Sequence, residues 1–299
     1  MFDSDVALYT QHTDNVFSVA WSPDGASIAS GGRDHSVHIW QPSTRLRLLT
    51  FHGHSSTILS LAWSPDSQCL ASGGTDGLVQ VWQASTGKII TTYRGHVRFV
   101  RSVSWSPDGR HIASGGEYGD NTVQIWEAFT GRHLYTHSTQ YRIFAAPWSP
   151  RNEHIASASF DGTVQVWQAY TGNLLTSYPG HTGPVYTAAW SPDGSALVSG
   201  DHHGAIHLWE ARSGRTLHTF LECGRAVKAV AFSPDGFYIA AGGDELAVDI
   251  WSIQSGEIVA SDRRHSTWIR ALAWSPDSSQ LVSASSKTAY LYSIASLSF

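Results

Sequence analysis

The sequence predicts an all-β fold in which seven small four-stranded antiparallel sheets are arranged radially around one axis. The main observation is a Trp-Ser-Pro-Asp motif, or a close variant of it, that occurs seven times at steps of 42, 42, 43, 42, 42 and 42 residues. No segment shows the 3.6-residue period of a helix. One unit of this length cannot bury its apolar faces alone, so neighbouring units must pack on one another. The seven motifs begin at Trp21, Trp63, Trp105, Trp148, Trp190, Phe232 and Trp274.

One repeat contains four short strands separated by tight turns. In the first repeat, residues 16–21 and 28–30 are apolar, and residues 37–40 alternate as a strand does. A turn sequence, Ser22-Pro23-Asp24-Gly25, separates the first two strands, and residues 48–51 form the fourth. Radial packing of seven such sheets buries both faces of each sheet and leaves only short edges, which a single flat sheet would not do.

The chain begins and ends out of phase with its repeats. Residues 6–9 align with the fourth strand at 48–51, because Tyr9 and Phe51 each precede a histidine by three residues. We therefore expect residues 2–10 to supply the outer strand of the last sheet. Residues 1–299 are then expected to form a single domain closed by its own N-terminal segment.

Composition narrows the class of protein. Charged residues make up only 14% of the chain, which also has 27 Gly and 13 Trp, as is typical of an ordered, sheet-rich domain. A net charge of −5 argues against non-specific nucleic-acid binding. Cys69 and Cys223 lie in different repeats and form no disulfide framework, which fits a reducing compartment, so we expect a cytoplasmic protein. Neither a membrane span nor a signal peptide is predicted.

These repeats resemble those of the WD40 family over essentially the whole chain. The repeats are unusually similar to one another, and in this they resemble bacterial WD40 arrays, which often adjoin kinase or other signalling domains. The resemblance implies a seven-bladed WD40-type β-propeller with four antiparallel strands per blade. In that family a His, a Ser or Thr, an Asp and a Trp form a hydrogen-bonded tetrad in each blade. The matching residues in the first three repeats are His12, Ser30, Asp34 and Trp40; His54, Ser72, Asp76 and Trp82; and His96, Ser114, Asp120 and Trp126.

The later repeats depart from that tetrad. The fourth has Thr139 in place of the His, and the fifth has His203 in place of the Asp. The seventh keeps His265 and Ser283, loses the turn Asp and ends on Tyr292. In the sixth, all three polar positions differ, with Cys223, Ala241 and Glu245. We expect blades four to seven to be held less well by buried polar bonds, since a lost buried partner costs about 1–3 kcal/mol.

No catalytic, cofactor or metal site is predicted. A Ser–His–Asp set that recurs in several blades has a structural role and is not a catalytic triad. The Gly-Gly pairs are hairpin turns, because no helix follows them as it does in a phosphate-binding loop. The best local histidine cluster is His202 and His203 beside Asp201, but adjacent residues seldom converge on one ion and no third ligand has reliable spacing.

The informative positions are those that vary where the rest of the repeat does not. They lie four and six residues before each strand-ending Trp or Phe, and directly before each turn Asp. These positions are rich in aromatic residues and arginine, the residue types that are enriched at interface hot spots. In this family that face commonly binds partners, whereas the Ser-Pro-Asp turns on the opposite face suit a passive surface. The candidate partner-binding residues, called the mouth set below, are Phe17, Phe99, Arg101, Arg142, Phe144, Phe160, Tyr186, Lys228, Trp268 and Arg270.

Three functions remain open from the sequence. The first is a non-catalytic scaffold that binds a protein or peptide, with an acidic or phosphorylated segment favoured by the basic members of the mouth set. The second is a propeller enzyme with its site in the central channel, which would require convergent acid, base or metal groups that the sequence does not contain. The third is a purely architectural module of a larger signalling protein.

Overall fold

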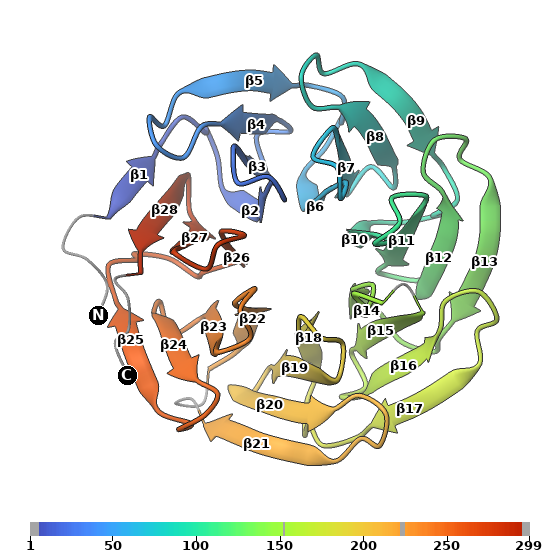
Figure 1. Ribbon diagram of the computed structural model, residues 1–299. Helices are drawn as coiled ribbons and strands as arrows, with labels where there is room; N and C mark the ends of the chain where they lie inside the picture. The colour runs from blue at the N-terminus through green and yellow to red at the C-terminus, as the bar shows by residue number, and fades with distance from the viewer. Residues whose placement is uncertain (1–5, 152, 222–224, 295–299) are drawn as a thin grey trace.

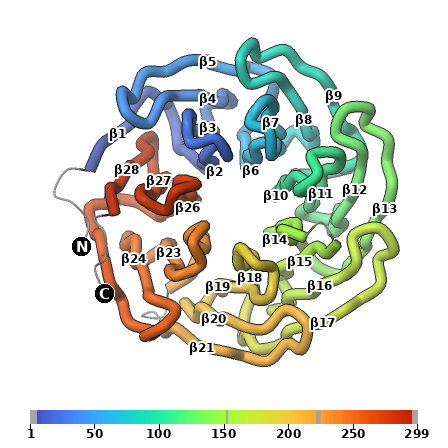
Figure 2. Tube along the Cα trace, in the orientation of Figure 1, coloured from blue at the N-terminus to red at the C-terminus, as the bar shows by residue number. Residues whose placement is uncertain are grey.

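The computed structural model describes residues 6–151, 153–221 and 225–294 of the chain. Seven four-stranded antiparallel sheets, the blades, surround a central axis in chain order (Figure 1). The Cα trace follows the same path around the ring, with residues 7–9 and 288–293 side by side (Figure 2). The predicted fold class, a seven-bladed all-β propeller with four strands per blade, is confirmed.

Each blade runs from an innermost strand beside the axis to an outer strand at the circumference (Figure 1). The strands of blades one to three are β2 (Val16–Trp21), β3 (Ile28–Gly32), β4 (Val37–Trp40), β5 (Arg47–Phe51), β6 (Ile58–Trp63), β7 (Cys69–Gly74), β8 (Val79–Gln83), β9 (Ile89–Tyr93), β10 (Val100–Trp105), β11 (His111–Gly116), β12 (Thr122–Glu127) and β13 (His133–Ser138). Those of blades four to six are β14 (Ile143–Ala145), β15 (His154–Ser159), β16 (Val164–Gln168), β17 (Leu174–Tyr178), β18 (Val185–Trp190), β19 (Ala196–Asp201), β20 (Ala205–Glu210), β21 (Thr216–Leu221), β22 (Val227–Phe232), β23 (Tyr238–Gly243), β24 (Val248–Ser252) and β25 (Ile258–Asp262). Blade seven consists of β26 (Ala271–Trp274), β27 (Gln280–Ser285), β28 (Thr288–Ser293) and β1 (Ala7–Tyr9).

The N-terminal strand closes the ring. β1 pairs antiparallel with β28, with Ala7 opposite Leu291 and Tyr9 opposite Ala289. The prediction that the N-terminal segment supplies the outer strand of the last blade is therefore confirmed, with the strand itself at Ala7–Tyr9. Residues 2–5 of the predicted 2–10 segment lie outside the described residues.

The Ser-Pro-Asp turns are held by a repeated hydrogen-bond pattern. In blade two, Ser64 Oγ donates to Asp66 Oδ1 at 2.6 Å, and the Gln68 N–H donates to the same oxygen at 3.0 Å. Ser64 Oγ also accepts from the Cys69 N–H. A short polar side chain that satisfies its own turn in this way needs no contact with other elements, which explains why the sequence repeats so closely here.

At four of the junctions between blades, a Tyr or Phe ring of one blade is stacked on a buried tryptophan of the next. Tyr9, at the end of the outer strand of blade seven, lies 4.6 Å from Trp40 of blade one, with the two rings 5° from parallel. Tyr93, at the end of the outer strand of blade two, is stacked in the same way on Trp126 of blade three, at 4.4 Å. 

Tyr93 ends β9 and Trp126 lies on β12, so this stack also joins two neighbouring blades. The apolar cores accordingly lie between blades, where adjacent sheets face each other.

The first three tetrads are assembled as the resemblance implies. In blade one, His12 Nδ1 donates to Asp34 at 2.7 Å, and His12 Nε2 accepts from Ser30 Oγ at 2.8 Å. Trp40 Nε1 donates to the same serine oxygen at 3.1 Å. The same bonds recur in blades two and three, among His54, Ser72, Asp76 and Trp82 and among His96, Ser114, Asp120 and Trp126.

The tetrad of blade five is complete, which corrects the expectation drawn from His203. His181 Nδ1 donates to Asp201 at 3.0 Å, while Ser199 Oγ bonds His181 Nε2 and accepts from Trp209 Nε1. Asp201 is the last residue of β19 rather than a turn residue. In blade three the corresponding residue is Gly116, where an added Cβ would lie 2.1 Å from the Asp120 carboxylate. In blade five, the strand residue Asp201 therefore places its carboxylate at the point that the carboxylate of the turn aspartate occupies in blades one to three.

Blade seven also has a closed network. His265 Nδ1 donates to Ser285 Oγ at 2.6 Å, and its Nε2 lies within hydrogen-bond distance of Ser283 Oγ and Tyr292 Oη. Ser285 occupies the strand position that Asp201 occupies in blade five. Blade seven, which we expected to be held less well by buried polar bonds, therefore keeps such a network, because a serine stands in place of the aspartate and a tyrosine hydroxyl in place of the indole N–H.

Blades four and six do lack the full network within the described residues. In blade four, Thr139 bonds two backbone carbonyls in place of the missing His, and both Ser159 Oγ and Trp167 Nε1 are buried without a partner. In blade six, Ala241 is buried, and Glu245 instead pairs with exposed Arg225 at 3.5 Å. Cys223 lies outside the described residues.

A missing hydroxyl at Phe51 leaves a buried group unsatisfied, and this generates a stability prediction. Tyr93 Oη donates to Gln124 Oε1 at 2.7 Å, whereas Phe51 stacks equally well on Trp82 but leaves Gln80 Oε1 buried without a partner. Phe51→Tyr should therefore raise the free energy of unfolding by about 1 kcal/mol, as measured by urea denaturation. The reciprocal Tyr93→Phe variant should lose a similar amount, and a destabilised Phe51→Tyr protein would contradict the assignment.

The surroundings of buried His38 and half-buried His207 predict that stability depends on pH. Burial and the neighbouring His12 lower the pKa of His38 to about 3, and burial and the neighbouring His181 lower the pKa of His207 to about 4. The unfolded chain binds protons below about pH 6.5, and the folded chain does so only at lower pH. The free energy of unfolding should therefore fall as the pH drops from 6.5 towards 4, by about 1–2 kcal/mol per histidine at pH 5.

The chain itself supplies the test of this pH dependence. Gln80 and Gln124 occupy the position of His38 and His207 in blades two and three, each opposite the tetrad serine. The double variant His38→Gln/His207→Gln should therefore fold and lose much less stability than the wild type between pH 7 and pH 5. Exposed His133→Gln serves as the control. An unchanged pH slope in the double variant would show that these two histidines do not cause it.

Candidate functional site

The centre of the propeller mouth is built from residues in β-bulges of the innermost strands. In β10 the register shifts between Val100 and Ser102, so Arg101 between them has no partner in the ladder. The same shift isolates the second residue of five other inner strands. A bulge re-aims a side chain, and here it explains why one position per blade departs from the strand alternation. These residues are Phe17, Leu59, Arg101, Phe144, Tyr186 and Lys228, and Arg270 directly precedes β26 in blade seven.

Arg142 is held between two aromatic rings. Its guanidinium carbon lies 4.6 Å from the centre of the Tyr118 ring and 4.5 Å from that of Phe160. Tyr118 also contacts Phe99 edge-on at 5.6 Å. Such stacking orients a guanidinium while leaving its N–H groups available. Tyr118 was not predicted as a member of this site, because the turn of blade three is longer than its counterparts and the residue before the turn Asp is Gly119.

A second group centres on Tyr186. The Lys228 ammonium lies 3.6 Å from the centre of the Tyr186 ring, and Phe144 contacts the same ring at 4.9 Å. Tyr186 Oη is 3.1 Å from His202 Nδ1. Phe144 is also 6.4 Å from Phe160, which connects this group to the one around Arg142.

The third group lies at the seam between blades seven and one. The Arg270 guanidinium is 4.4 Å from the Phe17 ring centre and 5.5 Å from that of Trp268, which is 50% exposed. Trp268 and Arg270 line a hollow of about 340 Å³ together with Asp244 and Arg225. An exposed indole beside a cation is the composition expected of a binding surface rather than of a core.

The cations at the centre of the mouth repel one another. Burial, Arg101 and Arg270 lower the pKa of Lys228, against an opposing effect of Asp244. Burial and Arg101 likewise lower the pKa of Arg270. Within the described residues Arg101 makes no hydrogen bond or ion pair. These three cations, from blades three, six and seven, therefore share one electrostatic environment without a neutralising partner for each.

Two carboxylates offset part of this charge. Glu117 is almost fully buried, and its burial raises the pKa of the carboxyl, although Arg101 and Arg142 act to lower it. Asp244 has one buried carboxylate oxygen without a hydrogen-bond partner. With four cations of the mouth set against these two acids, the centre of the mouth keeps a positive excess on a chain whose net charge is −5. All ten residues of the mouth set are thus linked by ring contacts or by electrostatic coupling.

One cluster in the described residues has the ligand types of a metal site. Potential ligand atoms of His12, Asp34 and His38 lie within 4.8 Å of one another. The two imidazoles, however, are stacked at 4.0 Å with only 13° between their planes. The nitrogen lone pairs of parallel rings do not converge on one point, and these side chains already bond one another and Ser30, Ser36 and Tyr9. This geometry favours a structural role.

The comparison with protein families agrees with the fold. The model of the WD domain, G-beta repeat, matches the chain seven times, at residues 4–41, 46–83, 87–127, 130–168, 172–210, 214–252 and 256–293. The chain therefore belongs to the WD40 family, whose propellers are typically protein-binding scaffolds and usually non-catalytic. No curated protein matches the chain. In its described part, the protein has no helix with the length and hydrophobicity needed to cross a bilayer.

The mutual repulsion at the mouth generates a further stability prediction. Because its surroundings lower the pKa of Lys228, they disfavour the charged form that is present at pH 7. Lys228→Met removes the charge and keeps most of the side-chain volume, so it should raise the unfolding temperature. A fall in the unfolding temperature, measured by calorimetry at low salt, would show that pairing with Asp244 outweighs the repulsion.

Proposed function

We propose that this protein is a non-catalytic scaffold that binds an acidic or phosphorylated protein segment at the mouth set. The observation that carries the proposal is the placement of Arg101, Lys228 and Arg270 around the centre of the mouth without full neutralisation. An anionic group placed there would relieve the repulsion between them. Arginine forks also suit the planar oxygens of carboxylate and phosphate groups.

The aromatic residues supply the apolar part of the proposed contact. Phe99, Phe160 and Trp268 are each at least one-third exposed. Phe160 lies beside the guanidinium of Arg142, and Trp268 lies beside that of Arg270. Aromatic anchors beside arginine are the usual composition of a binding hot spot. Because Arg142 and Arg270 are already stacked on rings, little side-chain entropy is lost when a ligand binds.

The alternatives have less support. A channel enzyme would need an acid, a base or a metal beside a space for substrate, and the mouth brings together mostly cations and rings. A purely architectural module, resembling the bacterial arrays in signalling proteins, would not need unneutralised cations at its centre. We infer that the partner is a cytoplasmic protein, since the buried thiol of Cys69 is free.

The test is an affinity pull-down with mass spectrometry that compares the wild type with an Arg101→Ala/Arg142→Ala variant. Partners that depend on the mouth should be lost from the variant and retained by Leu59→Ala, which changes the same bulge position in blade two. With a purified partner, each arginine change should weaken binding by about 1–2 kcal/mol.

Salt dependence separates a charged contact from an apolar one. Affinity for a genuine partner should fall as ionic strength rises, because the attraction between the basic mouth and an acidic segment is screened. A partner whose affinity is indifferent to both salt and the arginine substitutions would place the recognition site elsewhere on the propeller.

A further inference from the structure

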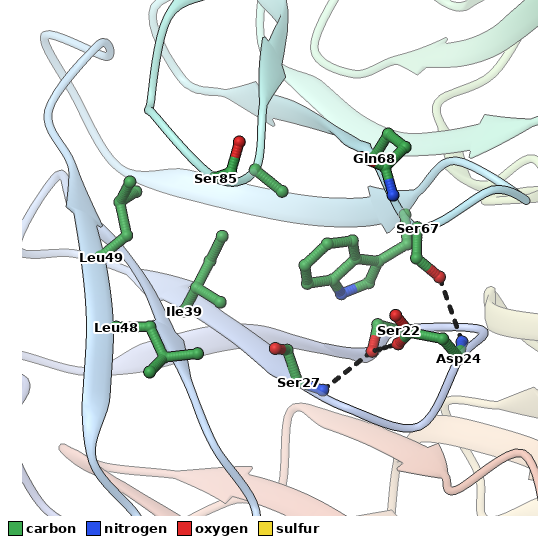
Figure 3. Close-up of a pocket in the computed structure, with 11 residues that line it drawn as sticks. Ser22, Asp24, Ser27, Ile39, Leu48, Leu49, Ser67, Gln68 and Ser85 are labelled. Atoms are coloured by element: carbon green, nitrogen blue, oxygen red, sulfur yellow. Dashed lines mark hydrogen bonds between the residues drawn. The ribbon is translucent and has the colours of Figure 1, made fainter.

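A groove opens between blades one and two on the face that carries the Ser-Pro-Asp turns. It is a hollow of about 260 Å³, with Ile39 and Leu48 of blade one on one side and Trp63 and Ser85 of blade two on the other. Asp24 lies at its edge (Figure 3). We call this hollow the first interblade groove. It lies on the opposite face from the mouth set, because successive antiparallel strands carry the chain from one face to the other.

The protein covers the next two equivalent places along the ring, in blades three and four, with its own aromatic side chains. Between blades two and three, the Phe129 ring contacts the Trp105 ring at a tilt of 53°, with the ring centres 6.0 Å apart. Between blades three and four, Tyr170 lies 6.0 Å from Trp148. The residue at the same position in blade two is Ser85, which is too small to reach Trp63.

The turn that carries this residue has the same backbone in both blades. The Gly87 N–H donates to the Gln83 carbonyl at 2.8 Å. The Gly131 N–H donates to the Glu127 carbonyl at 2.9 Å, and the two glycines have φ of 72° and 71°. The missing ring at Ser85 is therefore a difference of side chain alone, and the backbone there would place an aromatic ring as it places Phe129.

Trp63, at the base of the first interblade groove, is held in the same way as Trp105 of blade three. Trp63 Nε1 donates to the Ala20 carbonyl at 3.1 Å, and Trp105 Nε1 donates to the Ala62 carbonyl at the same distance. The first interblade groove is thus a place on this fold where an aromatic ring fits over a fixed indole, but where the chain supplies none.

The negative charge at the first interblade groove indicates which charge a ligand should carry beside its aromatic ring. Asp24 is the only charged residue among those that line the hollow. Its Oδ1 accepts hydrogen bonds from Ser22 Oγ and the Ala26 N–H, and its other carboxylate oxygen has no bond within the described residues. A ligand with a positive charge beside its ring complements this edge, and one with a negative charge does not.

We propose that the first interblade groove binds a phenylalanine or tyrosine side chain of a partner peptide that carries a lysine or arginine beside the aromatic residue. The ring takes the place over Trp63 that Phe129 takes over Trp105, and the basic residue lies against Asp24. The Ser-Pro-Asp face, which the sequence predicts to be passive, then carries a second recognition site that is independent of the mouth.

The probe is 2-phenylethylamine, a ring with one ammonium group, and the readout is the indole N–H resonance of Trp63, assigned with a Trp63→Phe variant. In the wild type this resonance should shift saturably, with half-saturation on the order of 10 mM, as expected for so small a ligand. The carboxylate analogue 3-phenylpropionate should bind about threefold more weakly, the scale of an exposed ion pair.

Matched variants decide the test. Ser85→Phe copies Phe129 into the groove and should abolish the shift, whereas Ser43→Phe, the same change at the equivalent turn of blade one, should leave it intact. No saturable shift in the wild type, or an equal shift in Ser85→Phe, would overturn the proposal. If Ser85→Phe does not fold, Asp24→Asn decides the test instead, because the asparagine side-chain oxygen can still accept the hydrogen bonds of the turn. Loss of the preference for 2-phenylethylamine over 3-phenylpropionate in this variant supports the proposal. An unchanged preference overturns it.

Discussion

The structure depends on the stacking of an aromatic ring from one blade on the tryptophan of the next. Tyr9 on Trp40 and Tyr178 on Trp209 are separated by the same 4.6 Å and lie within 5° of parallel. The serine that fixes each indole also fixes the histidine of the same blade, so packing and polar bonds act on one side chain. Because Tyr9 belongs to the closing strand, the last of these contacts forms only when the ring is complete.

A ring held in this way can accept unfavourable groups at its centre. The bulges of the inner strands direct one side chain per blade towards the mouth, and three of those side chains are cations that repel one another. Their charge costs stability, and the contacts between blades offset it. Binding sites commonly carry such local strain, since the same charges that destabilise the free protein attract a ligand.

Departures from the repeat are more informative here than the repeat itself. At Ser85 the chain omits the aromatic ring that it supplies at Phe129. At Thr139 it omits the histidine that other blades contain, and Ser159 Oγ and Trp167 Nε1 are left without hydrogen-bond partners. The first omission opens a groove, and the second weakens a buried network. An array of near-identical units thus provides internal controls, because the chain itself contains the alternative residue in the same backbone setting.

The sequence by itself determined the number of blades, the strands in each and the closing segment, because a strict period with alternating apolar residues allows few other arrangements. It also determined the tetrads wherever spacing was kept. Spacing failed at Asp201 and Ser285, since a strand residue there reaches the histidine from a different point on the backbone. Tyr118 was missed for a related reason, because a longer turn shifts it out of alignment with its counterparts.

Only the tertiary structure decided which side chains meet at the mouth and that a groove stays open at Ser85. Arg101, Lys228 and Arg270 are far apart along the chain, and their mutual repulsion arises from closure of the ring around a common axis. The gap at Ser85 likewise exists only because Leu48 and Trp63 come from neighbouring blades. Both are properties of the spaces between repeats, which a pattern within one repeat does not encode.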